Sequence, residues 1–170
     1  MLTRTIIEVK KLKSFAKHIF SFILPIAVLV IIPYGIEKNI SPGNISVLII
    51  GLLIICLGLS LMIVCISLFI RIGNGTLAPW NPTRKFVIAG PYRYVRNPMI
   101  IGVLIVLFGE SVAILSFNIF LWALAFFIMN NIFFTLYEEP NLVKKFGKEY
   151  QEYKRKVSRW VPRLKPYSPD

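Results

Sequence analysis

Two short polar clusters, about 40 residues apart, carry the side chains best suited to chemistry. The stretch GPYRYVRNPM places Arg96 and Asn97 directly before an apolar run, and Glu138 and Glu139 follow directly after a later one. Asn97-Pro98 signals a helix start, because Asn is a preferred N-cap and Pro is favoured at the first helical position. A helix N-terminus beside an arginine favours a carboxylate or phosphate group. The two glutamates can pair with an arginine of the first cluster or hold a cation.

Each cluster also has a plainer interpretation. Tyrosine and arginine are common at membrane interfaces, where their polar ends reach water. Two acidic residues at a helix start stabilise the helix through its dipole. From either cluster alone, these alternatives stay open.

Four apolar runs must position the clusters. The chain is 56% hydrophobic with a mean hydropathy of +0.68. Residues 19–36, 45–70 and 119–137 carry no charge, and 99–117 carries only Glu110, with a turn expected at 117–118. A membrane-spanning helix needs about 20 apolar residues, and the runs lack the alternation of barrel strands. The sequence therefore predicts an all-α integral membrane protein with four transmembrane helices, the first an uncleaved anchor because no small-residue cleavage site follows it.

The net charge of +12 agrees with this segmentation. Of the 20 lysines and arginines, 19 fall in alternate connecting segments of a four-span chain, all on one side of the membrane. This positive-inside pattern predicts a multi-pass protein with both termini and the polar clusters in the cytoplasm. Basic flanks facing anionic membrane lipids explain the charge, so nucleic-acid binding is not favoured.

The chain divides into three regions on this basis. Residues 1–18 form a basic cytoplasmic N-terminus, 19–70 hold two membrane helices, and 71–170 form the candidate catalytic region. That region contains a cytoplasmic loop, a transmembrane hairpin at 98–137 and a tail. In the tail a new helix is expected at Pro140, because apolar residues recur at spacings of 4, 4, 3 and 4 on one face. These residues are Leu142, Phe146, Tyr150, Tyr153 and Val157.

The remaining chemically active side chains are sparse. Cys56 and Cys65 lie on one predicted helix, about 13 Å apart along its axis, too far for a disulfide. With His18 as the lone histidine and no cysteine cluster, the sequence predicts no metal site. Glu110 lies about 16 Å along its helix from the proposed pocket, so we expect a structural hydrogen bond or an outer-interface position.

The two polar stretches together resemble a known superfamily. GPYRYVRNPM, followed by EEPNLVKKFGKEYQEYKRKVSRWVPRL, is similar to the isoprenylcysteine carboxyl methyltransferase and phospholipid methyltransferase superfamily of integral membrane enzymes, over about residues 74–164. The resemblance implies an S-adenosylmethionine-dependent methyltransferase whose pocket forms from loop, hairpin ends and tail. The chain accordingly lacks the glycine-rich motif of a Rossmann domain.

The resemblance also implies roles for particular residues. Arg96 matches the arginine before the family's H/N-P step and is a candidate catalytic residue. Glu139 is the second, as a candidate base for an amine acceptor. The positions implied to contact the cofactor are Phe86, Val87, Tyr92, Asn97, Pro98, Met99, Ile100 and Glu138.

Departures from the family pattern bear on the methyl acceptor, which we expect to be lipid-like or prenylated. Ile100 replaces a tyrosine that would add a polar cofactor contact, and Phe134 replaces the arginine with which the prenylcysteine enzymes bind substrate. Asn97 stands where those enzymes have histidine. The acceptor classes are therefore isoprenylcysteine carboxylate and phospholipid amine, and Asn97 favours the phospholipid branch or a prokaryote-like branch of the superfamily.

Two other functions remain open. Sterol reductases resemble the superfamily in their C-terminal half and bind a nicotinamide cofactor, but they are longer. A non-enzymatic membrane scaffold would bind neither cofactor. The spacing of Gly51 and Gly58, seven residues apart, suggests a close helix–helix contact without defining an oligomeric state.

Overall fold

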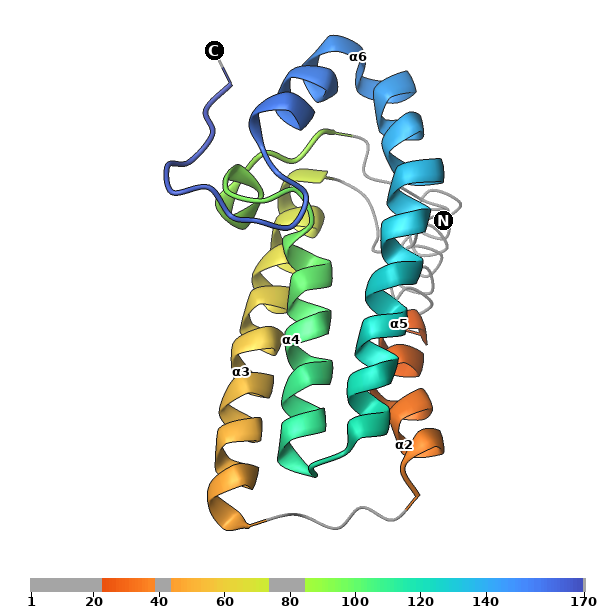
Figure 1. Ribbon diagram of the computed structural model, residues 1–170. Coiled ribbons are helices and arrows are strands. Elements are labelled where there is room, and N and C mark those ends of the chain that lie inside the picture. The colour runs from red at the N-terminus through yellow and green to blue at the C-terminus, as the bar shows by residue number, and fades with distance from the viewer. Residues whose placement is uncertain (1–22, 39–43, 74–84, 170) are drawn as a thin grey trace, which may run out of the picture.

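Every regular element of the described chain is a helix (Figure 1). The computed structural model describes residues 23–38, 44–73 and 85–169. The first helix runs over Ile23–Ile36 and includes a π-helical turn, η1 (Ala27–Ile31), and α2 (Ile32–Ile36). It is followed by α3 (Ile45–Leu68), π-helical η2 (Phe69–Gly73), 3₁₀-helical η3 (Gly90–Arg93), α4 (Pro98–Ala113), α5 (Phe117–Phe133), π-helical η4 (Phe134–Glu138) and α6 (Glu139–Lys156). The predicted all-α class is confirmed for these residues.

Among the described residues, two helices are long and apolar enough to cross a membrane. They cover Ile45–Gly73, with a hydropathy of 3.1, and Phe117–Lys156, with 2.0. The other two, Ile23–Ile36 and Pro98–Ala113, are shorter apolar helices. The apolar helices thus lie where the sequence places them, whereas the four-span topology and the cytoplasmic termini remain predictions. The basic N-terminus at 1–18, the beginning of the first run and residues 74–84 of the loop lie outside the described residues.

Glycines bring α3 and α4 into close contact. A Cβ atom at Gly58 would lie 2.7 Å from the Gly102 carbonyl oxygen, and one at Gly51 would lie 2.5 Å from the Ala113 Cβ. Gly109 meets α3 in the same way. The close contact suggested by Gly51 and Gly58 therefore forms within the chain, between α3 and α4.

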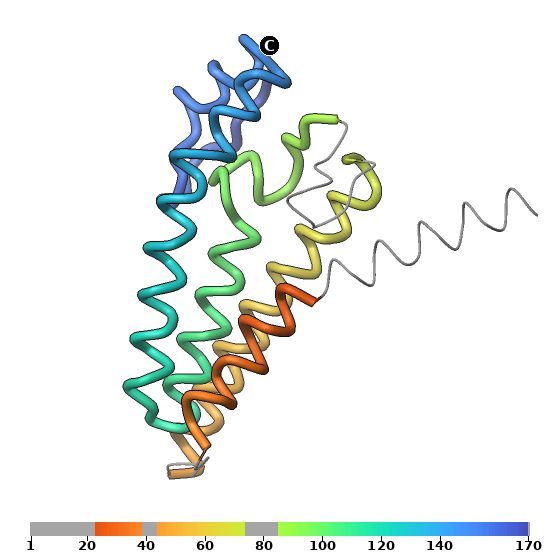
Figure 2. The backbone as a smooth tube through the Cα atoms, turned by 90° about the vertical axis from the view of Figure 1, so that its right-hand side faces the viewer, coloured from red at the N-terminus to blue at the C-terminus, as the bar shows by residue number. Residues whose placement is uncertain are grey.

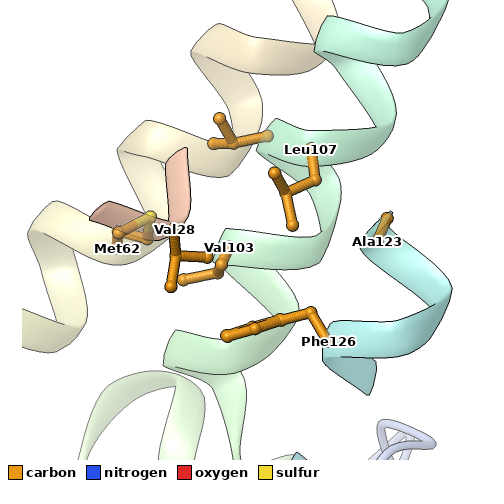
Figure 3. Packing of buried hydrophobic residues seen from close by; sticks show 7 residues of the cluster. Val28, Met62, Val103, Leu107, Ala123 and Phe126 are labelled. Carbon is orange, nitrogen blue, oxygen red and sulfur yellow. The ribbon is translucent and has the colours of Figure 1, made fainter. Parts of the chain in front are cut away.

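Branched and aromatic side chains fill the space beside this contact (Figure 3). The cluster joins the first helix, α3, α4 and α5 through Val28, Met62, Val103, Val106, Leu107, Ala123 and Phe126. Leu107 is fully buried at its centre. The outward faces of α3 and α5 carry exposed residues such as Leu53, Leu57 and Ile128, as expected of helices that face lipid.

The α4–α5 turn comes earlier than the sequence predicts. The third apolar run was expected to end at residue 117, but α4 ends at Ala113, and Leu115 adopts a positive φ of 52°. Ser116 then caps α5, its hydroxyl oxygen accepting a hydrogen bond from the Ile119 amide at 3.3 Å. The predicted turn at 117–118 is wrong because a leucine takes the left-handed position and a serine provides the cap, in a sequence without a turn signature.

The helix that begins at Phe117 continues far beyond its apolar part. Pro140 lies in the first turn of α6, but η4 joins α5 to α6 without an interruption (Figure 2). The chain bends at Gly147 instead, where φ is 58° and ψ is −129°, values that favour glycine. The predicted amphipathic face is confirmed, because Tyr150, Tyr153 and Val157 are buried together, with Leu142 and Phe146 packed against them.

Two smaller predictions concern residues within the apolar helices. Cys56 and Cys65 are both free thiols, as expected. Glu110 lies near the end of α4 opposite to Arg96, but its Oε2 atom is buried without a hydrogen bond. The structural hydrogen bond that we considered for Glu110 is therefore not formed by that atom among the described residues.

The α3–α4 contact predicts opposite outcomes for two identical substitutions. Gly58→Ala should lower the thermal unfolding temperature in detergent, because overpacking typically costs about 1–3 kcal/mol. Gly35→Ala in α2 has no atom within 4 Å of the new methyl group and should keep or raise stability. Equal effects of the two substitutions would contradict the close packing.

Candidate active site

The loop before α4 and the tail after α6 lie at the same end of the bundle, here called the site end (Figure 1). Hydrogen bonds hold the two segments together. Three are between backbone groups: Arg96 N to Ser158 O at 2.9 Å, Arg163 N to Tyr94 O at 3.0 Å, and Tyr167 N to Arg93 O at 2.8 Å. Another hydrogen bond joins the loop to α6 itself, from the Tyr153 hydroxyl to the Tyr92 carbonyl oxygen at 2.6 Å. The tail is therefore part of the site end's architecture, not a separate appendage.

The loop before α4 packs in two directions. Phe86 lies against α6. Its ring centroid is 5.1 Å from that of Phe146 and 5.1 Å from that of Tyr153. Val87 is buried on the other side with Cys65 and Tyr92. Successive side chains of an extended segment point to opposite sides, which explains this division. The loop is thus fixed between α3 and the tail.

Tyr92 sits in this second cluster, just after the turn at Gly90. Gly90 has a φ of +53°, and the 3₁₀ turn of η3 follows it directly. The Tyr92 ring lies 5.3 Å from the Phe69 ring, and its side chain is buried. Burial, followed by interactions with Cys65, raises the pKa of Tyr92 well above its usual value, so the phenol stays neutral at physiological pH.

A buried carboxylate lies at the centre of the site end. Glu139 Oε1 lies 2.8 Å from an Arg96 nitrogen and 2.7 Å from an Arg159 nitrogen, and Oε2 lies 2.7 Å from Lys154 Nζ. Burial acts to raise the pKa of Glu139, but the hydrogen bond from Lys154 and the charges of Arg96 and Arg159 outweigh it, so the pKa is lowered. The predicted pairing of a glutamate with an arginine of the loop is confirmed for Arg96 and Glu139.

Arg159 extends this charge cluster to α5. Its Nε also donates to Glu139 Oε1 at 2.8 Å, and its NH1 group donates to Asn131 Oδ1 at 2.7 Å and to Thr135 Oγ1 at 2.8 Å. The Trp160 indole donates to the same Asn131 oxygen at 3.2 Å. The guanidinium thus joins the tail to the end of the predicted fourth span.

Glu138 contrasts with its neighbour. Its side chain is half-buried and makes no hydrogen bond or ion pair with any described residue. Burial and the negative charge of Glu139 raise the pKa of Glu138 to about 7, against the opposing charge of Arg159. Among the described residues, the site end therefore holds one carboxylate bonded through both oxygens and one that makes no hydrogen bond or ion pair.

Two hydrogen-bond donors near the two glutamates also lack hydrogen bonds among the described residues. Asn97 precedes α4, but its side chain makes no capping hydrogen bond. Arg96 uses NH1 for Glu139, while its Nε atom is buried without a partner. Buried donors are normally satisfied, so the unpaired Nε is consistent with an additional acceptor at this place.

The remaining residues predicted to contact the cofactor are apolar, and they pack within the protein. Pro98 is fully buried, and Met99 packs against the cluster of Cys65, Val87 and Tyr92. Ile100 instead packs against the central cluster of the bundle. Their proposed roles toward a cofactor remain predictions.

Sequence reasoning missed Arg159 and Lys154. Both reach Glu139 because the chain turns back after Gly147, and such long-range contacts leave no local pattern in the sequence. The available signal was weak: Lys154 lies within the amphipathic stretch and Arg159 directly after it, in a tail already expected to belong to the catalytic region.

The unpartnered Glu138 predicts a pH-dependent stability difference. Because its pKa is raised on folding, the deprotonated side chain destabilises the protein above about pH 7, and this cost disappears as the pH falls towards the ordinary glutamate range. Glu138→Gln should therefore raise the unfolding temperature at pH 8 but not at pH 4.5. A variant that is less stable than wild type at pH 8 would contradict the assignment.

Comparison with known proteins identifies the family of the chain. A family model described as phospholipid methyltransferase matches residues 46–149, which include α3, the loop before α4 and both glutamates. Neither a curated protein nor a solved structure matches the chain. The matched region covers more than half of the sequence, and the chain belongs to the phospholipid methyltransferase family.

Proposed function

We propose that the chain is an S-adenosylmethionine-dependent methyltransferase that binds its methyl donor at the site end. The observation that carries the proposal is the difference between two adjacent carboxylates. Glu139 is held by three cations, whereas Glu138 makes no hydrogen bond or ion pair within the part of the chain that the structure describes. A half-buried carboxylate without a partner is costly for stability, and such groups are concentrated at functional sites.

The uncommitted groups suit the polar parts of the donor. Glu138 can accept hydrogen bonds from its ammonium group or ribose hydroxyls. Arg96 Nε and the Asn97 amide can bind its carboxylate, supported by the N-terminus of α4. When bound, S-adenosylmethionine supplies an electrophilic methyl group on a sulfonium ion.

The other residues predicted to contact the cofactor fall into two groups according to their solvent exposure. Phe86, Met99 and Ile100 are partly exposed, and we infer that they contact the donor directly. Val87, Tyr92 and Pro98 are buried, and we infer that they support the pocket wall. In an in-line methyl transfer such positioning supplies much of the rate.

The acceptor that fits best is the amine of a phospholipid. Phe134 occupies the place where prenylcysteine enzymes bind substrate, and it is buried with its ring 5.9 Å from that of Trp160. Arg159 is the cation that could bind a substrate carboxylate in place of the missing arginine, but its guanidinium already donates hydrogen bonds to Glu139, Asn131 and Thr135. A carboxylate acceptor would have to compete for it, whereas an amine would not.

An amine acceptor must lose a proton before or during transfer. Both Glu139 oxygens are occupied, and its lowered pKa makes it a weak base. Glu138, with a pKa of about 7, suits that task better. Glu138 can therefore hold the donor or take the proton, and a binding measurement separates these roles.

The proposal predicts binding of S-adenosylhomocysteine. Titration calorimetry on the detergent-purified protein should give micromolar affinity, because the product retains every polar group named above. Glu138→Gln should lose this binding if Glu138 holds the donor, or retain it and lose methyl transfer if Glu138 is the base. Glu149→Gln, the same change at an exposed position of α6, is the control and should change neither.

Failure of the folded wild-type protein to bind S-adenosylhomocysteine would contradict the methyltransferase proposal. A parallel titration with a nicotinamide dinucleotide then distinguishes the alternatives: a reductase-like relative binds it, and a scaffold binds neither ligand.

A further inference from the structure

The tail carries a segment, Trp160 to Leu164, that reaches the membrane-facing part of α5. Figure 1 shows the chain descending after α6 to the level at which α4 begins. The Trp160 ring centroid lies 4.9 Å from that of Phe127 and 5.9 Å from that of Phe134. Phe127 is in the interior of the apolar run at 119–137. The segment is therefore next to the region where lipid must be.

The apolar side chains of residues 161 and 164 are highly exposed to solvent. Leu164 is 99% exposed and Val161 is 71% exposed. On the adjoining helix, Leu136 is 73% exposed and Ile132 is 54% exposed. Apolar side chains exposed to this extent are favourable against lipid and unfavourable against water.

Arg163 lies between these two apolar residues and differs from three other arginines of the site end. Arg93 donates to the Tyr167 carbonyl oxygen, and both Arg96 and Arg159 bind Glu139. The Arg163 guanidinium is half-buried, makes no hydrogen bond or ion pair with a described residue, and has its NH1 atom buried without a partner. A buried guanidinium nitrogen without an acceptor is costly, so an external anion is expected at this group.

We propose that residues 160–164 form a phospholipid-binding element. The Arg163 guanidinium binds the headgroup phosphate, a planar donor array being well suited to phosphate oxygens. Val161 and Leu164 lie among the acyl chains. The inference concerns lipid binding and holds whether or not the bound lipid is the methyl acceptor, so its test requires no methyl transfer.

The element can be tested by native mass spectrometry of the detergent-solubilised full chain. The probes are phosphatidylethanolamine and diacylglycerol with the same acyl chains, which differ by the phosphate-containing headgroup. Arg163→Gln should weaken phosphatidylethanolamine binding roughly tenfold, as expected for loss of a charge-assisted hydrogen bond. Lys165→Gln removes the same charge from an exposed tail position and should have less than about a twofold effect. Diacylglycerol binding should be unchanged in both variants.

Further variants keep the outcome interpretable. Arg163→Lys retains the charge and should recover part of the affinity. Leu164→Ser changes a side chain with no packing contacts to lose, and it should weaken binding of both lipids. Equal effects of Arg163→Gln and Lys165→Gln would overturn the phosphate contact. If Arg163→Gln instead weakens S-adenosylhomocysteine binding and leaves lipid binding unchanged, the anion is the donor's carboxylate and the proposal is wrong.

Discussion

A single buried carboxylate governs the arrangement of the site end. Glu139 is withdrawn from water, and an uncompensated charge there would be strongly destabilising. Its three cations come from different places: Arg96 precedes α4, Lys154 lies in α6 and Arg159 lies in the tail. Satisfying Glu139 therefore requires the loop, the helix and the returning tail to meet. Because Glu139 takes these cations, the adjacent Glu138 forms no ion pair with a described residue, and this asymmetry is the basis of the proposed chemistry.

The helices supply the framework for this meeting point. Close contact between α3 and α4, permitted by glycines such as Gly58, fixes the position at which Arg96 leaves the bundle. The uninterrupted passage from α5 through η4 to α6 carries both glutamates past the apolar run without a flexible joint. The bend at Gly147 then directs the second half of α6 back, so that Tyr153 and Arg159 can contact the loop. Membership in the phospholipid methyltransferase family is consistent with a membrane framework that holds its polar site at one end.

Much of the fold and part of the site follow from local sequence patterns. The apolar runs, the helix start at Pro98 and the amphipathic face of the tail are short-range features, and each is found in the structure. The pairing of Arg96 with Glu139 could also be predicted, because a helical hairpin brings its two ends together. The turn at Leu115 and the bend at Gly147 depend on backbone conformations that composition does not specify. The roles of Arg159 and Lys154 depend on those bends and so could not be read from spacing.

The central claim is that satisfaction of Glu139 organises the ligand-binding groups. The most direct measurement compares Glu139→Gln with Glu152→Gln, which alters an exposed ion pair to Lys156 within α6. Thermal unfolding and S-adenosylhomocysteine titration would be recorded for both variants. We expect Glu139→Gln to destabilise the protein by about 3 kcal/mol and to abolish binding, because three cations lose their shared charge. We expect Glu152→Gln to leave both properties unchanged. A Glu139→Gln protein with wild-type stability and wild-type affinity would contradict the claim.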